Sequence, residues 1–177
     1  MRAATGLAVL ATLLYPLAIW LGLARFEPRW VAMVLLAVAI LRALVSRQLV
    51  WRLASLGALA LVIATWTFND GMPLKLYPAL LNAVLLAIFG FSLLKPPTVI
   101  ERIARVRHPD LPASGVRWVT NVTRVWCVFF MVNGTIALWT ALHASDAAWA
   151  LYNGGIAYVL IGTLLVGEWC LRPRHAK

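Results

Sequence analysis

Acidic side chains are scarce in this sequence: six Asp and Glu residues stand against sixteen Lys and Arg in 177 residues. Charged residues of either sign make up only 12% of the chain and hydrophobic residues 63%, whereas soluble domains carry about 25% charged and about 45–50% apolar residues. A soluble domain could not bury so much apolar surface. The net charge of +10 therefore comes from basic residues between apolar segments, and it does not indicate a nucleic-acid-binding surface.

Cysteine and histidine are also sparse. Cys127 and Cys170 lie inside apolar segments and form no C-x-x-C pair or disulfide framework. The three histidines, His108, His143 and His175, lack the paired spacing of a metal site. No nucleophile, base and orienting group occur together, and no glycine-rich phosphate loop is present. The sequence therefore predicts a non-enzymatic protein with no cofactor and no metal.

Long apolar stretches dominate the rest of the chain. A helix rises about 1.5 Å per residue, so about 20 apolar residues cross a hydrocarbon layer of about 30 Å. The stretches predict an all-α polytopic transmembrane helical bundle, with residues 1–177 as a single integral membrane domain. Six spans are expected, at residues 4–24, 30–46, a segment that ends near Phe68, 76–94, 118–142 and 148–171. If the first apolar segment is a cleaved signal peptide, five remain.

The basic residues predict the orientation, because Lys and Arg near span ends are retained in the cytoplasm. Three basic residues fall in the gaps on one side, Arg25, Arg29 and Lys75, and two fall within spans or at their edges, Arg42 and Arg124. The other side collects eleven: Arg2, Arg47, Arg52, Lys95, Arg102, Arg105, Arg107, Arg117, Arg172, Arg174 and Lys177. Both termini are therefore expected in the cytoplasm. Tryptophans near span ends are expected to form an interfacial belt, namely Trp20, Trp30, Trp51, Trp118, Trp149 and Trp169.

Residues 95–117 form the one sizeable loop, on the predicted cytoplasmic side. Thr98 followed by Glu101 is a capping box, which predicts a short amphipathic interfacial helix near residues 98–107, with Glu101 paired to Arg105 one turn on. The remainder, residues 108–115, is rich in turn-forming residues and is expected to be irregular. Arg102, Arg105 and Arg107 are candidates for a cytoplasmic docking surface that attracts anionic lipid or a partner.

Polar residues inside the spans are the candidate intramembrane contacts. A charge at a helix centre costs about 2.5–3.5 kcal/mol, so Arg124 is expected to pair with Glu168 or to contact an anionic headgroup or substrate. Asn82, Asn121, Asn133 and Asn153 either hydrogen-bond across helices or line a shared polar cavity. Asn153-Gly154-Gly155 would allow another backbone to approach closely. The glycines expected to serve helix packing are Gly90, Gly134 and Gly162.

Several short motifs, in order, carry a family resemblance: Phe68-Asn69-Asp70, Lys95-Pro96-Pro97, Glu101-Arg102, Asn121, Trp126, Val128-Phe129-Phe130 and Asn133-Gly134. Over roughly residues 60 to 172 the chain resembles the intracellular septation protein A family of small bacterial inner-membrane proteins. The resemblance implies a non-enzymatic role in cell-envelope maintenance, through contacts with envelope or division membrane proteins. None of the shared positions has a known chemical role. The Ala-, Leu- and Trp-rich composition and Arg124 depart from the family pattern and suggest a divergent branch.

Two other functions stay open at this point. Similar small membrane proteins accompany fatty-acid-like and polyene-pigment pathways, so a lipid or acyl-chain handling component is the main alternative. A small-solute transporter built from inverted repeats is the weaker one. The expected partners are membrane lipids and envelope or division proteins, with a homo-oligomer as a further option and nucleic acid excluded. The ligand is not identified by the sequence.

Overall fold

The fold was analysed in a computed structural model that describes residues 30, 32–33, 36–37, 40, 49–68 and 70–172. The expected first span, most of the second, Arg42 and the terminal residues Arg2, Arg174 and Lys177 lie outside the described residues. Every regular element in the described part is helical and none is a strand. The prediction of an all-α protein is therefore confirmed for this part of the chain.

Three segments are long and apolar enough to cross a membrane. The first, Met72–Leu94, joins α5 (Met72–Lys75) to α6 (Tyr77–Leu94), and the second is α8 (Ala113–His143). The third, Asp146–Leu171, consists of α9 (Asp146–Leu151), the π-helix η1 (Tyr152–Ile156) and α10 (Ala157–Leu171). These segments contain the predicted fourth, fifth and sixth spans.

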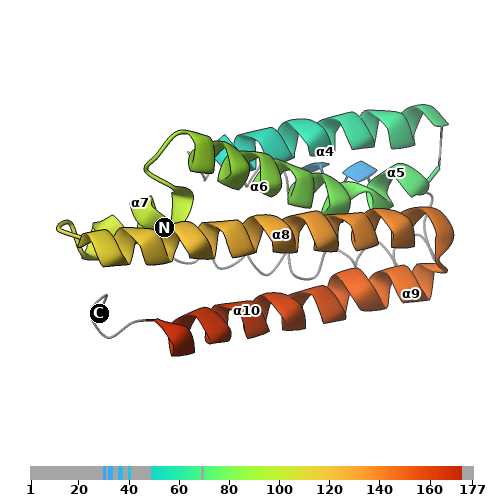
Figure 1. Ribbon diagram of the computed structural model, residues 1–177. Coiled ribbons are helices and arrows are strands. Elements are labelled where there is room, and N and C mark those ends of the chain that lie inside the picture. Colours follow the sequence, from blue (N-terminus) through green and yellow to red (C-terminus); the bar gives the residue numbers. More distant parts are fainter. Residues whose placement is uncertain are drawn as a thin grey trace.

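The long helices lie side by side in the order α4, α6, α8 and then α9–α10 (Figure 1). Helix α4 (Leu49–Phe68) ends where the third span was predicted to end, although its described apolar part, Leu56–Phe68, is shorter than a full span. Asp70 forms the turn that follows, because its Oδ1 accepts from the backbone N–H of Met72 at 2.9 Å. Pro73 then opens α5.

The capped loop helix is present as α7 (Val99–Arg107), which packs against α8 at one end of the bundle (Figure 1). Thr98 Oγ1 accepts from the backbone N–H of Glu101 at 3.2 Å, so the predicted cap is confirmed. The Glu101 carboxylate binds Arg105 at 2.8 Å instead of completing the capping box. Ser92 Oγ accepts from Val99 N–H at 3.1 Å and ties α6 to the start of α7.

The end of the loop differs from the prediction. Helix α8 begins at Ala113, with Pro112 in extended conformation at its N-cap, so residues 113–115 are helical and not irregular. Pro112 lacks a backbone N–H, and the start of a helix is where that loss costs least. The loop between α7 and α8 is thus shorter than the sequence indicated.

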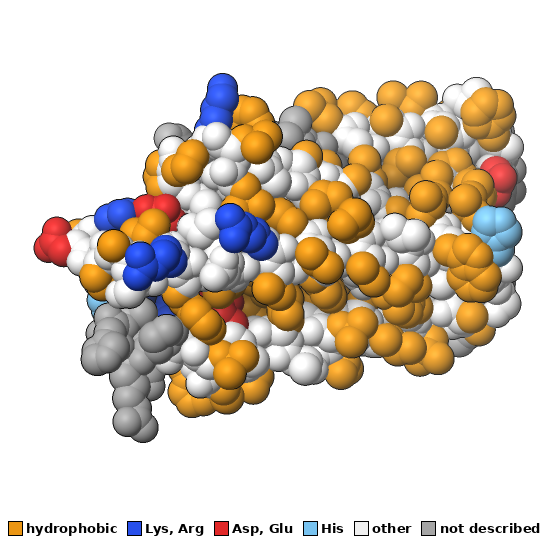
Figure 2. Space-filling view, in the orientation of Figure 1, with side chains coloured by type: hydrophobic (Ala, Val, Ile, Leu, Met, Phe, Trp, Pro, Cys, Tyr) orange, Lys and Arg blue, Asp and Glu red, His pale blue; other side chains and the backbone are white. Residues whose placement is uncertain are grey.

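Large apolar side chains cover the outside of the described bundle, as Figure 2 shows for one face. On α10, Val159, Val166 and Trp169 are each at least 60% exposed. Apolar surface of this extent is not stable in water and fits the hydrocarbon of a bilayer. Its distribution, together with the three long apolar segments, indicates a membrane protein.

Candidate functional site

Buried asparagines join the three long segments. Asn133 Nδ2 donates to Asn82 Oδ1 at 3.1 Å, which connects α8 to α6, and Tyr152 of the π-helix donates its hydroxyl to Asn133 Oδ1 at 2.8 Å. Asn82 also donates to Pro78 O at 2.8 Å in its own helix. Both asparagines are buried. Their polar atoms bond within the protein, as expected for side chains that hold helices together in a bilayer.

The other two asparagines lie elsewhere. Asn153 is buried and donates to Thr140 Oγ1 at 3.3 Å and to Trp149 O at 3.0 Å. Asn121 is exposed near the start of α8. A single polar cavity lined by all four asparagines is therefore not formed. At Gly155, a Cβ would contact only the side chain of Leu151 in the same segment among the described residues.

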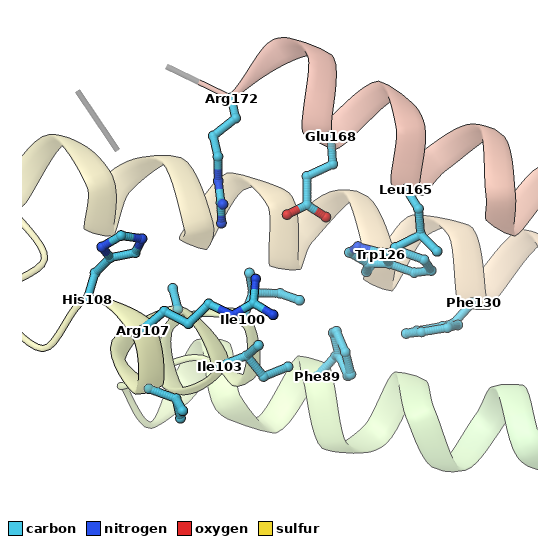
Figure 3. Close-up of a pocket in the computed structure, with 12 residues that line it drawn as sticks. Phe89, Ile100, Ile103, Arg107, His108, Trp126, Phe130, Leu165, Glu168 and Arg172 are labelled. Carbon is cyan, nitrogen blue, oxygen red and sulfur yellow. The ribbon is translucent and has the colours of Figure 1, made fainter. Parts of the chain in front are cut away.

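Arg124 does not pair with Glu168 as the sequence suggested. Its guanidinium donates to Asn121 Oδ1 at 3.1 Å, and the side chain is exposed on α8. Asn121 lies one turn before Arg124 on the same helix, so its amide reaches the guanidinium without any approach of α10. Among the described residues Glu168 forms no ion pair, and its carboxylate points into a cavity between the helices (Figure 3).

This cavity, which we call the α7–α10 cavity, has a volume of about 540 Å³ and is bounded by α6, α7, α8 and α10. Its apolar end is formed by three aromatic side chains, Phe89, Trp126 and Phe130 (Figure 3). The ring centroids of Phe89 and Phe130 are 5.1 Å apart in an edge-to-face arrangement. Such aromatic contacts hold the walls together and give a rigid apolar surface.

Charged side chains gather at the other end of the cavity. Glu168 extends into it from α10, Arg172 extends into it from the C-cap of α10, and Arg107 extends into it from the end of α7 (Figure 3). His108 also lines this mouth. The cavity thus combines an apolar interior with a charged mouth of mixed sign, in a size range typical of small-molecule sites.

A second cavity of about 450 Å³ lies between α8 and α10 and shares Trp126 and Glu168 with the first. Both cavities arise because the last segment separates from α8 along its length. Helix α9 and the π-helix pack on α8, whereas α10 lies farther from α8 and contributes Ile161 and Leu164 to the apolar cluster around Trp126 and Phe130. The π-helix, an irregularity often found at functional sites, lies at this transition.

The three arginines of the predicted docking surface make different contacts. Arg102 donates to Pro97 O at 3.0 Å, and Arg105 binds Glu101 and Pro109 O, so both stabilise the loop. Arg107 alone of the three lines the cavity. The sequence did not single out Phe89, Trp126, Phe130 or Arg172 as site residues. The spacing of Glu168 and Arg172 at i and i+4 was the one signal in the sequence that could have pointed to this site. Such spacing normally indicates an ion pair within a helix.

The opposite end of the bundle is closed by a polar contact between segments. Lys75 forms an ion pair with Asp146, and Trp149 Nε1 donates to Lys75 O at 3.1 Å. Trp149 is fully buried, so it is not part of an interfacial belt, whereas Trp169 is 71% exposed. Burial is favoured here because the indole N–H finds a backbone carbonyl inside the protein.

The described residues contain no group of three or more His, Cys, Asp or Glu side chains that could hold a metal ion. The geometry defines a helical membrane protein with two adjoining cavities between its last helices. No protein-family model, curated protein or solved structure matches the chain.

Proposed function

We propose that this chain is a multi-pass protein of the bacterial inner membrane, with both termini in the cytoplasm, that binds a lipid or acyl chain without transforming it. The observation that carries the proposal is the α7–α10 cavity, with its aromatic interior and its mouth of Arg107, Glu168 and Arg172. An amphipathic molecule is the natural complement of such a site, because its chain fills the apolar part and its polar end meets the charges.

The position of the mouth supports this proposal. It lies at the α7 end of the bundle, where most of the described Lys and Arg residues gather (Figure 2). In the proposed orientation this end meets the cytoplasmic headgroups, where each basic residue attracts anionic lipid by about 1 kcal/mol. A chain could then enter sideways from the bilayer. Such a role fits a component of a fatty-acid-like or polyene-pigment pathway.

Filling the cavity tests the proposal. Leu165 lines the α7–α10 cavity, while its neighbour Val166 lines neither cavity, and the two are 52% and 60% exposed. We expect Leu165→Trp to reduce the lipid retained by the detergent-purified protein about tenfold, a loss of about 1.4 kcal/mol, as measured by native mass spectrometry. Val166→Trp is the matched control and should retain lipid as the parent protein does. If both variants retained equal amounts of lipid, the cavity would not be the lipid-binding site.

A second candidate is a septation-protein-like role in envelope maintenance through contacts with membrane proteins. It is favoured by the exposed apolar side chains of α7 at the rim of the α7–α10 cavity, where Ile103 and Val106 are 62% and 83% exposed. Arg102, exposed on the same short helix, adds a positive charge beside them. A partner protein could cover this face. The motif resemblance between residues 60 and 172 is the other support for this candidate.

A further inference from the structure

The mouth of the α7–α10 cavity carries charges of both signs, and this mixture selects among lipid headgroups. We propose that the cavity recognises a phosphoethanolamine headgroup, with the phosphate at Arg107 and Arg172 and the ammonium at Glu168. This inference rests on the proposed function, because it names the class of lipid that the same cavity takes. It follows from the placement of three side chains and from their charges.

The two guanidinium groups form the part of the mouth that is proposed to bind the phosphate. Arg172 reaches into the mouth from the C-cap of α10 and Arg107 reaches into it from the end of α7 (Figure 3). Neither forms an ion pair with a described carboxylate. Guanidinium groups present a planar set of N–H donors that matches phosphate oxygens, often two at a time. A phosphate between them would be held from both sides of the cavity.

Glu168 is the side chain that distinguishes one lipid headgroup from another. It is the one carboxylate among the residues that line the mouth, it is half-buried, and among the described residues it has no ion-pair partner. A headgroup with negative charge alone would place a like charge near this carboxylate and offer it no cation of its own. A primary ammonium would donate hydrogen bonds to it and could also lie near the Trp126 ring, which lines the same cavity. A trimethylammonium has no N–H to donate.

The test is a competition between headgroups. The full-length protein is reconstituted in vesicles of equal parts palmitoyl-oleoyl phosphatidylethanolamine, phosphatidylglycerol and phosphatidylcholine, and the lipids retained after extraction are measured by native mass spectrometry. We expect phosphatidylethanolamine to be enriched over the other two by about tenfold or more, the scale of one charge-assisted hydrogen bond. Glu168→Gln should abolish this preference and shift retention toward phosphatidylglycerol.

Asp110→Asn is the matched control, because it removes the same charge from an exposed carboxyl in the loop outside both cavities. It should leave the preference unchanged. If Glu168→Gln retains the preference of the parent protein, or if Asp110→Asn alters it equally, the headgroup assignment is wrong. That failure is distinct from failure of the proposed function, because Leu165→Trp would still remove the retained lipid. If Leu165→Trp and Val166→Trp retain lipid equally, both proposals fail together.

Discussion

Asn82 contributes both a hydrogen bond and a close packing contact between α6 and α8. Its amide oxygen accepts from Asn133, and its Cβ lies 2.9 Å from the position that a Cβ on Gly134 would occupy. Gly134 therefore permits the close approach of α8 to α6 that brings the two amides together. The predicted packing role is confirmed for Gly134, whereas Gly90 and Gly162 face open space among the described residues.

Gly134→Ala is therefore expected to destabilise the bundle by about 1–3 kcal/mol, the usual cost of overpacking. Gly162→Ala is the control on α10, where the added methyl meets nothing within 4 Å. There the substitution should be neutral or should stabilise the helix by about 0.5–1 kcal/mol. Unfolding of the purified proteins in mixed detergent micelles, followed by circular dichroism, measures both. Equal destabilisation by the two variants would show that Gly134 has no special packing role.

Helix α7 shows which parts of an element the sequence can predict. Its position, its Thr98 cap and its Glu101–Arg105 pair were all readable, because each depends on residues within about one turn. The sequence did not predict the direction in which the apolar side chains of α7 face. Ile100 packs against the buried cluster of Ala104, Leu111 and Val119, but Ile103 and Val106 are left exposed at the rim of the cavity. That outcome depends on where α8 and α10 lie.

We expect the exposed side of α7 to contact lipid headgroups and chains. A photo-crosslinking amino acid at Val106 should recover phospholipid adducts from intact cells. Leu142 is the control position, because it is 46% exposed at the other end of the bundle. A discrete protein adduct at Val106, absent at Leu142, would contradict the expectation and support the envelope-contact role instead. The adducts are identified by mass spectrometry after purification.

Across the whole molecule, the described charges are unevenly divided between the two ends. Arg102, Arg105 and Arg107 on α7 lie with Lys95, Arg117 and Arg172 near the same end of the bundle (Figure 1). At the other end Lys75 is neutralised by Asp146. The asymmetry agrees with the positive-inside rule if the α7 end faces the cytoplasm.

The proposed orientation predicts the activity of topology reporters. A reporter fused after Lys177 should be active only if it functions in the cytoplasm. One inserted at Ser145, in the short connection between α8 and α9, should be active only if it functions in the periplasm. Fluorescent protein and alkaline phosphatase fusions at both sites measure this. The opposite pattern would reverse the orientation and place the cavity mouth at the outer surface.

By itself the sequence determined the helical class, the apolar segments and several helix ends. Apolar runs, prolines and capping side chains act over one or two turns, so their effect is local. Only the tertiary structure decided that Arg124 binds Asn121, that Trp149 is buried, and that Glu168 faces a cavity with Arg107 and Arg172. Those outcomes depend on how closely helices distant in sequence approach each other, and that is set by side-chain packing across the whole bundle.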